Sequence, residues 1–310
     1  MQIGFIGLGK MGGGMSARLA SAGHEVHGYA PSVQTREAAE ATGVHTHISR
    51  DEMIQSMQTP RAVWVMIPDR FVEEEISQLI EILEEGDIII EGGNTPFKQA
   101  VDQSARAHEK GIQFLDIGVS GGLVGADQGY SMMAGGDQEA YETIEPLLRD
   151  LCQQDGYGYF GPAGAGHFVK MVHNGIEYGV MQAFAEGFEI INSGPYENID
   201  LSKLADVWQH GSIIQSFINS LAVDIFRDNR SLDGVEGSVN MLGEGQWTLE
   251  YAQEHNIDAR VLEAAIARRA ESQAGNISFA SKYLAATRNA FGGHSLNKIN
   301  DDSRESTRNV

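Results

Sequence analysis

The chain has 310 residues, of which 42% are hydrophobic and 21% are charged. This is the balance of a globular protein with a sizeable core, and at roughly 150 residues per domain the length suggests two domains. Acidic residues outnumber basic ones by 43 to 22, and the resulting formal net charge of −21 repels nucleic acid and anionic lipid, so neither is expected as a partner.

The composition also bears on where the protein works. No stretch approaches the roughly 18 uninterrupted apolar residues that a membrane span requires. The first ten residues, MQIGFIGLGK, predict a strand, because they lack the basic leader and the cleavage site of a signal peptide. The single cysteine, Cys152, is compatible with a reducing compartment. We therefore expect a cytoplasmic protein.

The first predicted element is a nucleotide-binding turn. QIGFI predicts a short buried strand, and Gly7-x-Gly9-x-x-Gly12 follows it before a stretch with helical spacing. In such a turn the first glycine permits the bend, the second lets a pyrophosphate approach the backbone, and the third lets the helix pack on the strand. The helix N-terminus offers unpaired N–H groups to phosphates. The residues predicted to bind a dinucleotide here are Gly7, Gly9, Lys10, Met11 and Gly12.

Strand and helix patterns then alternate through the first half of the chain. Further strands are predicted in HEVHGYA, RAVWVMIP, DIIIEGGN and GIQFLDIGVSG, with acid-rich helical stretches such as RFVEEEISQLIEILEEG between them. This alternation predicts a doubly wound parallel sheet of the Rossmann type. Ligands of such sheets bind beyond the carboxyl ends of the strands. The residues at those ends are Pro68, which fits an ordinary turn equally well, Asn94, Ser120, Gly121 and Gly122.

The end of the second strand leaves the choice of cofactor open. An NAD site normally carries Asp or Glu there to bind the ribose 2′-hydroxyl, whereas NADP needs a basic or hydroxyl group for its 2′-phosphate. Ala30 holds that position here, and Ser32 or Arg36 could bind a phosphate. The sequence therefore predicts NAD or NADP, without a preference.

From about residue 163 the strand pattern gives way to helical spacing. Helices are predicted in residues 164–194, 200–211, 213–228 and 258–273, the first ending at a Ser-Gly-Pro stop and the second beginning at a capping Asp200. The tail after about residue 300 is polar. We predict a dinucleotide-binding domain over residues 1–162 and an all-α domain over residues 163–310.

The first of these helices carries polar groups in an otherwise apolar stretch. Lys170, Asn174 and Glu177 are spaced by four and three residues, so they lie along one stripe of the helix. His173 and Tyr178 flank that stripe. A lysine–glutamate face exposed to solvent would give the same spacing. The glycine-rich, apolar surroundings favour a buried stripe instead, and buried polar groups need partners or a function.

Taken together, these motifs resemble a known family. GFIGLGKMG, DIGVSGG and GAGHFVKMVHN are similar to the β-hydroxyacid dehydrogenases, over essentially the whole chain. Three further motifs narrow the resemblance to the short form of the 6-phosphogluconate dehydrogenases: the helix pattern Lys-x-x-His-Asn-x-x-Glu-Tyr at 170–178, GEGQWT at 243–248 and RNAFGGH at 288–294. The resemblance implies oxidative decarboxylation of 6-phosphogluconate to ribulose 5-phosphate and carbon dioxide, with NAD or NADP reduced.

The resemblance also implies roles for individual residues. Lys170 is the base for the 3-hydroxyl proton, and a desolvated lysine can be neutral enough for that task. Glu177 protonates C1 after carbon dioxide leaves, and Asn174 orients the 3-hydroxyl. Ser32, Pro68 and Asn94 are implied at the cofactor. The residues implied to bind substrate are Asn94, Ser120, Gly121, Gly122, His173, Tyr178, Thr248, Arg268, Arg288 and His294, of which Tyr178, Arg268, Arg288 and His294 are implied at the phosphate.

In the family, Arg288 and His294 come from the partner subunit, so the resemblance implies a homodimer, or a dimer-based tetramer, whose C-terminal tails complete the sites. One position departs from the family pattern. Gln246 stands where the family carries Lys or Arg, and this removes a cation where the substrate is anionic.

Two other functions remain open. A β-hydroxyacid dehydrogenase of the 3-hydroxyisobutyrate or tartronate semialdehyde type would oxidise without decarboxylation. A non-catalytic binding module on the same fold is more remote, because Lys170 is present. No metal site is predicted, since the closely spaced His24, His27, His45 and His47 lack a third-ligand pattern and are interpreted as surface or strand positions.

Overall fold

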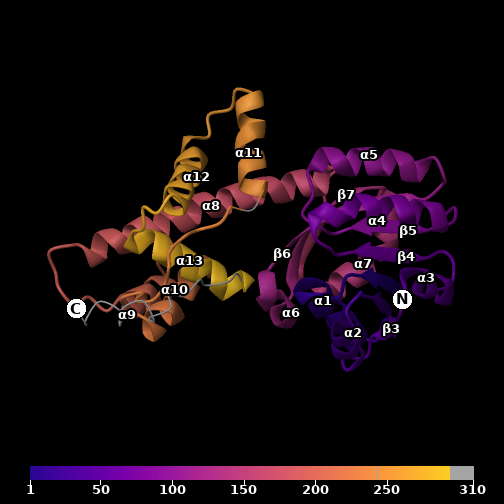
Figure 1. Ribbon diagram of the computed structural model, residues 1–310, viewed down its shortest axis with the longest axis horizontal. Helices are drawn as coiled ribbons and strands as arrows, with labels where there is room; N and C mark the ends of the chain where they lie inside the picture. The colour runs from indigo at the N-terminus through magenta and orange to yellow at the C-terminus, as the bar shows by residue number, and fades with distance from the viewer. Residues whose placement is uncertain (242, 294–310) are drawn as a thin grey trace, which may run out of the picture. The chain divides into compact units, whose positions relative to one another are not determined.

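The computed structural model describes residues 1–241 and 243–293. They form two compact units, a sheet unit up to Met171 and a helical unit from Val172 onward. Figure 1 shows the sheet unit in indigo to magenta and the helical unit in rose to yellow. Among the described residues, none of the helices combines the length and apolar character needed to cross a lipid bilayer.

The sheet unit contains an eight-stranded sheet in the order β3-β2-β1-β4-β5-β6-β7-β8. Its strands are β1 (Gln2–Ile6), β2 (Glu25–Tyr29), β3 (His45–His47), β4 (Ala62–Val65), β5 (Ile88–Glu91), β6 (Gln113–Ser120), β7 (Tyr130–Gly136) and β8 (Cys152–Tyr159). The parallel run from β3 to β6 confirms the predicted Rossmann-type sheet. One pairing departs from the parallel direction, since β7 pairs antiparallel with β6, with Ile117 opposite Ala134.

Helices cover both faces of this sheet, which is why its strands are apolar on both sides. They are α1 (Lys10–Ser21), α2 (Val33–Glu40), α3 (Arg50–Ser56), α4 (Asp69–Ile82), α5 (Phe97–His108), α6 (Gly125–Gln128) and α7 (Gln138–Leu151), with a 3₁₀ turn η1 at Gly122–Val124. In β4, Trp64 joins one core cluster, whereas Val63 and Val65 join the other. Neighbouring residues of a strand thus pack against opposite layers, as the pleat requires.

The helical unit consists of helices alone within the residues that the structure describes. Helix α8 (Ala165–Asn192) begins in the sheet unit and continues into the helical unit. The others are α9 (Leu201–Gln209), α10 (Phe217–Asp228), α11 (Gly243–Glu254), α12 (Arg260–Gln273) and α13 (Phe279–Gly292). Phe188 of α8 packs in an aromatic cluster with Trp208, Phe226 and Tyr283. The predicted all-α second half is confirmed.

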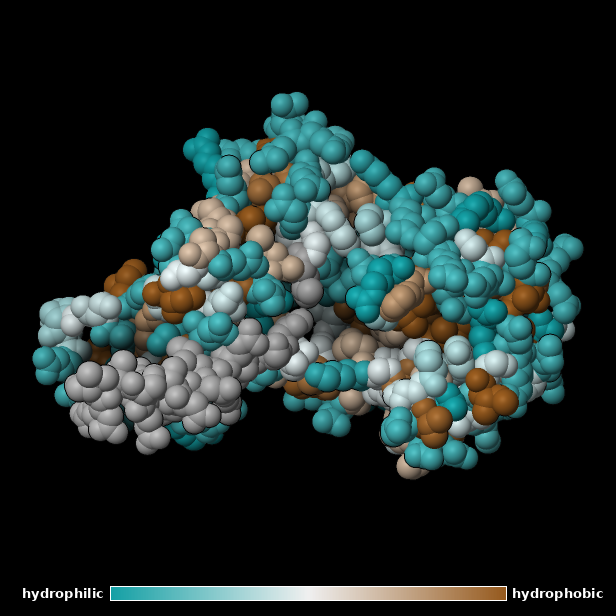
Figure 2. All heavy atoms as spheres, in the orientation of Figure 1, coloured by the Kyte–Doolittle hydropathy of each residue, from teal (hydrophilic) through white to brown (hydrophobic). Residues whose placement is uncertain are grey.

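The surface agrees with the composition. Figure 2 shows hydrophilic side chains over most of the visible face, with hydrophobic side chains in small separate groups.

Asp200 caps α9 as predicted, its carboxylate accepting the Lys203 N–H at 3.0 Å.

Candidate active site

The glycine turn after β1 has the geometry that its sequence predicts. Gly7 has φ +97°, and a Cβ there would lie 2.3 Å from the Met66 carbonyl oxygen. A Cβ on Gly12 would lie 2.0 Å from the Gly7 oxygen, so the turn itself requires both glycines. A Cβ on Gly9, in contrast, would meet no atom within 4 Å. The fold does not demand glycine at position 9, and the open space fits the pyrophosphate of a dinucleotide.

The same turn presents the start of α1 to that space. Helix α1 begins at Lys10, and no side chain caps its first turn, so its N–H groups can donate to phosphate oxygens. The predicted positions Lys10 and Met11 are therefore the first two residues of the helix. These features make the turn suitable for a dinucleotide.

The turn after β2 is ordered by the two residues considered for a 2′-phosphate. The Ser32 hydroxyl accepts the Thr35 N–H at 3.3 Å and so caps α2. The Arg36 guanidinium donates to the carbonyl oxygens of Ala30 and Pro31, at 2.6 and 3.0 Å. Both side chains hold the backbone of this turn. The choice between NAD and NADP stays open.

Pro68, Asn94 and Ser120 lie at or just after the carboxyl ends of three strands that are neighbours in the sheet, β4, β5 and β6. Pro68 is the N-cap of α4, and Asn94 is exposed in the loop after β5. Ser120 ends β6 and is followed by Gly121 and Gly122, whose φ angles of +125° and +53° favour glycine. The sheet thus brings these predicted residues to one edge.

Three buried ionisable residues, which the sequence analysis did not single out, lie near the same edge. Glu91 and Asp116 have no exposed surface and His167 is 3% exposed. His167 Nε2 is hydrogen-bonded to the Glu91 carboxylate. Asp116 accepts the backbone N–H groups of Gly164 and His167, at 2.7 and 2.8 Å. These bonds tie the first turn of α8 to β5 and β6.

The charges of this cluster are set by burial and by pairing. Burial works to raise the pKa of Glu91, but the charge of His167 and the hydrogen bonds to the carboxylate outweigh it and hold this pKa below its usual value. Burial alone would lower the pKa of His167, and the Glu91 carboxylate raises it instead. Burial raises the pKa of Asp116. Glu91 and His167 therefore form a buried ion pair.

Lys170 lies one turn after His167 on α8 and is 7% exposed. A Cβ on Gly118 of β6 would lie 2.3 Å from the Lys170 Cβ, and a Cβ on Gly166 would lie 2.2 Å from the Asp116 carbonyl oxygen. Glycines on both the strand and the helix thus let α8 lie directly against β6. This close approach places Lys170 beside the C-terminal half of β6.

In the helical unit, Asn174 is held at both ends of its side chain. Its Nδ2 donates to Glu244 Oε1 at 3.0 Å, and its Oδ1 accepts from His173 Nδ1 at 2.9 Å. Asn174 is 9% exposed and Glu244 is 4% exposed. Gly175 allows close contact, since a Cβ there would lie 2.8 Å from Thr248. The GEGQWT segment therefore packs on α8 and fixes the orientation of Asn174.

The predicted phosphate residues are divided by burial. The Tyr178 ring, 5% exposed, lies under the guanidinium of Arg269 at 3.3 Å. Arg269 is 1% exposed, and its Nη1 and Nη2 have no hydrogen-bond partner among the described residues. Burial lowers its pKa to about 10. Arg268, which the sequence analysis placed at the phosphate, is exposed and bonded to Glu271 at 2.5 Å. The geometry thus favours Arg269 over Arg268 as an anion ligand.

Arg288 and Gln246 are two further positions at which the resemblance expects a cation near the phosphate. Arg288 is 6% exposed. Burial lowers its pKa, and its charge interacts with Tyr178, Glu177 and Glu244 of the same chain. The resemblance assigns this arginine to the partner's site, and in this structure its charge also acts on its own chain's Tyr178. Gln246 donates to Glu250 at 3.0 Å. His294 lies outside the described residues.

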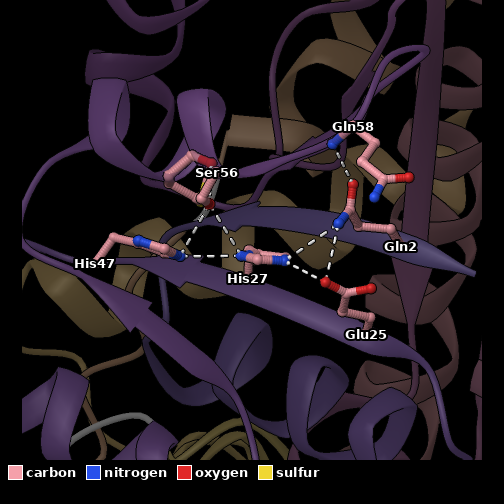
Figure 3. Close-up of polar contacts among 7 residues, drawn as sticks. Gln2, Glu25, His27, His47, Ser56 and Gln58 are labelled. Carbon is pink, nitrogen blue, oxygen red and sulfur yellow. Dashed lines mark hydrogen bonds and ion pairs between the residues drawn. The ribbon is translucent and has the colours of Figure 1, made fainter.

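The histidines near β2 form a separate cluster (Figure 3). His27 Nδ1 lies 3.0 Å from His47 Nε2, and Ser56 Oγ is within hydrogen-bond distance of both. His27 Nε2 lies 3.1 Å from Glu25 Oε1. His27 is buried in β2 at 6% exposed, and His45 and His47 are on β3. Within residues 1–241 and 243–293, no group of three or more His, Cys, Asp or Glu side chains could hold a metal ion.

Two family models match the chain. One, described as the NAD binding domain of 6-phosphogluconate dehydrogenase, matches residues 2–161. The other, described as the C-terminal domain of 6-phosphogluconate dehydrogenase, matches residues 166–309. Together they cover nearly all of the chain.

Individual relatives agree with these models. The Bacillus subtilis protein YqeC is 40% identical, over 96% of this chain and 100% of its own length. The NAD(+)-dependent, decarboxylating 6-phosphogluconate dehydrogenase of Haloferax volcanii is 34% identical, over 97% of this chain and 100% of its own length. The chain spans 59% of the longer Bacillus licheniformis 6-phosphogluconate dehydrogenase.

Solved structures show the same fold. The Plasmodium falciparum 6-phosphogluconate dehydrogenase superposes with a TM-score of 0.82 at 29% identity, over 97% of this chain and 67% of that one. The Mycobacterium tuberculosis 3-hydroxyisobutyrate dehydrogenase superposes with a TM-score of 0.72 at 24% identity, over 91% of this chain and 97% of that one.

Proposed function

This chain belongs to the 6-phosphogluconate dehydrogenase family, and we propose that it converts 6-phosphogluconate to ribulose 5-phosphate and carbon dioxide with reduction of NAD or NADP. The observation that carries the proposal is the arginine pair of the helical unit. Arg269 and Arg288 are buried in a chain of net charge −21, and two nitrogens of Arg269 have no partner among the described residues. A buried cation whose nitrogens lack hydrogen-bond partners is costly unless an anion binds it, and a phosphate would meet this requirement at Arg269.

The cofactor is assigned to the carboxyl edge of the sheet. The open space at Gly9 and the uncapped start of α1 suit the pyrophosphate. Ser32 or Arg36 lies where the ribose would be held, and Pro68 and Asn94 follow the neighbouring strands. When bound, the nicotinamide supplies the acceptor for the hydride.

The proposed reaction begins at C3 of the substrate. Lys170 takes the proton of the 3-hydroxyl as hydride leaves C3, and this gives a 3-keto acid. The ammonium of Lys170 then returns this proton to the ketone oxygen as the bond to the carboxylate breaks, so carbon dioxide leaves and the enediol forms. Glu177 finally protonates the carbon that lost the carboxylate, while Lys170 takes the proton back from the enediol oxygen and the ketone forms. We assign Asn174, held by His173 and Glu244, to orienting the 3-hydroxyl, and Ser120, Gly121 and Gly122 to the carboxylate end.

The phosphate end is assigned to the helical unit. We propose that Arg269, Arg288, Tyr178 and Thr248 bind the phosphate, and that Arg269 replaces the cation lost at Gln246. An arginine offers the planar fork that phosphate oxygens favour. His294 of a partner subunit's tail is the remaining ligand that the family implies, and it requires a homodimer.

The proposal is tested by a steady-state assay with 6-phosphogluconate and each cofactor in turn. We expect reduced nicotinamide and carbon dioxide in equal amounts, and the ratio of kcat/KM values decides between NAD and NADP. Parallel assays with 3-hydroxyisobutyrate, and with the hydroxyacid formed when tartronate semialdehyde is reduced, serve as the controls. Oxidation of a short hydroxyacid, with no turnover of 6-phosphogluconate, would instead assign the chain to the non-decarboxylating type.

A further inference from the structure

One buried carboxylate joins two separate elements of the sheet unit. Glu91, the last residue of β5, accepts the Gly93 N–H and the Thr95 hydroxyl, each at 2.6 Å. The same side chain is hydrogen-bonded to His167 in the first turn of α8. Thr95 is 4% exposed, so the whole group is shielded from water. Glu91 therefore connects the loop after β5 to the start of α8.

Both connected elements carry residues of the proposed reaction. Asn94 lies between Gly93 and Thr95, the two loop residues that bond to Glu91. Lys170 follows His167 by three residues, which is about one helical turn, so the two side chains share a face of α8. The Glu91–His167 pair is thus a direct hydrogen-bonded link between the backbone that presents Asn94 and the helix that presents Lys170.

Stability alone does not account for an ion pair at this place. Desolvating two charges can cost as much as their attraction returns, and apolar side chains of similar volume often stabilise a fold as well or better. A buried pair with several hydrogen bonds does, however, fix a geometry that apolar contacts would leave looser. The location of the pair, rather than its energy, is what calls for an explanation.

The other end of β5 offers a comparison. Asp87 directly precedes the strand and, like Glu91, has no exposed surface. It pairs with Arg61 at 3.1 Å and accepts the N–H groups of Arg61 and Glu84, at 2.6 and 3.0 Å. Its partners lie at the amino end of the parallel strands, opposite to the edge where ligands of such sheets bind. Asp87 is thus matched to Glu91 in strand, burial and pairing, but not in location.

We propose that Glu91 and His167 are a positioning pair, which sets the distance between Asn94 and Lys170 and thereby the rate of the reaction. Neither residue is assigned a contact with substrate. The inference rests on the proposed function, because it concerns the geometry in which Lys170 takes the 3-hydroxyl proton. Displacing a reacting group by about 1 Å can cost roughly 10²-fold in rate.

The test compares Glu91→Gln with Asp87→Asn in the full-length protein. Each substitution removes the charge and keeps the shape, and both are expected to lower the Tm. Only Glu91→Gln is expected to lower kcat, by roughly 10–100-fold, as removal of an orienting partner does at other sites. Its kcat/KM should fall by the same factor, since the geometry matters in the transition state. Its Kd for the reduced cofactor, measured by fluorescence, should stay near the wild-type value because the glycine turn is intact.

His167→Gln is the second variant, and it serves as the test if Glu91→Gln does not fold. This substitution keeps a hydrogen-bond donor for Glu91. If the two residues act as a unit, the double variant should lose no more kcat than the more damaging single variant, although losses of stability accumulate. All assays are run well below the lowest Tm of the set.

The outcomes separate the two proposals. A wild-type protein that does not turn over 6-phosphogluconate overturns the proposed function and the pair's part in it. An active wild type whose Glu91→Gln and His167→Gln variants keep full kcat, or whose Asp87→Asn variant loses as much kcat as Glu91→Gln, overturns the positioning pair and leaves the proposed function standing.

Discussion

Two places in the sheet unit bury histidines, and they differ in what each imidazole faces. At the carboxyl edge of the sheet, His167 faces the carboxylate of Glu91, which raises the pKa of His167 despite burial. Beside β2, His47 faces the imidazole of His27 at 3.0 Å. Burial and the charge of His27 lower the pKa of His47. One place therefore stabilises a positive charge on His167, and the other disfavours a positive charge on His47.

The difference shows what a buried ionisable group can reveal about function. Perturbed pKa values are common at active sites, but structural networks produce them as well. His167 is buried and His47 only half-buried, but His27 beside it is also buried, at 6% exposed, so burial alone does not distinguish the two places. The edge of the sheet does, because ligands bind beyond the carboxyl ends of parallel strands and Asn94, Ser120 and Lys170 lie there. We therefore assign His167 to the reaction and His27 and His47 to stability.

The largest effect is expected from replacing Lys170, the proposed base at the carboxyl edge of the sheet. Lys170→Met should lower kcat by roughly 10²–10⁴-fold or more, since a positioned base contributes about that much. Cofactor binding should survive, because the glycine turn is untouched. His47→Gln is the matched change in the other place and should leave kcat unaltered. Turnover measured for the two purified variants decides the matter, and an active Lys170→Met protein would contradict the assigned base.

The second largest effect is expected in helix α12, where a buried arginine and an exposed one are adjacent. Arg269→Met removes charged hydrogen bonds to the phosphate, each of which is worth roughly 1.5–3 kcal/mol, so KM for 6-phosphogluconate should rise about 10–100-fold. The same change removes a buried guanidinium whose Nη1 and Nη2 lack hydrogen-bond partners among the described residues. The variant should therefore be at least as stable as the wild type.

Arg268→Met is the control for this prediction. Arg268 is exposed and bonded to Glu271, and a surface pair of this kind contributes little. We expect wild-type KM and an unchanged Tm. Steady-state kinetics and thermal unfolding of both variants give the readouts. A raised KM in Arg268→Met, with Arg269→Met unaffected, would restore Arg268 to the phosphate end.

The choice between these two arginines also shows that two sequence signals can point to different residues. Family motifs pointed to Arg268, but helical spacing would have pointed to its neighbour. Leu262, Ile266 and Arg269 are spaced by four and three residues, and all are buried, so they share the packed face of α12. Helical periodicity is therefore the sequence signal that favours Arg269. Glu91 gave a similar signal, as a lone acid ending an apolar strand.

Much of the fold was predictable because most of its central strands are buried runs of apolar residues bounded by turn residues. β1, β2, β4, β5 and β6 all lie within the predicted segments. The strand β3 was missed because it has only three residues, and β8, CQQDGYGY, because it is polar and partly exposed. The antiparallel direction of β7 depends on the short connection through α6, which no periodicity reveals. Contacts such as Asn174 with Glu244 join residues 70 positions apart, and no local pattern specifies them.

The smallest expected effect concerns pH and tests the contrast between the two histidines directly. The pKa of His47 is lowered, so between that value and the unfolded value of about 6.5 the unfolded chain binds more protons. Stability should therefore rise with pH through this window and fall as the pH drops below about 6.5. The pKa of His167 is raised, so its contribution is present below about 6.5 and is lost as the pH rises through the folded value.

The two contributions can be separated by measuring the free energy of unfolding in denaturant at a series of pH values. His47→Gln should flatten the loss of stability below pH 6.5, because the groups that face His47, namely His27, His45 and Glu52, no longer meet an added charge. His167→Gln should leave that acid-side loss in place and change the slope above pH 6.5 instead. Identical profiles for the two variants would mean that an imidazole facing Glu91 and one facing His27 respond to protons alike, and the contrast on which the assignment of His167 rests would be lost.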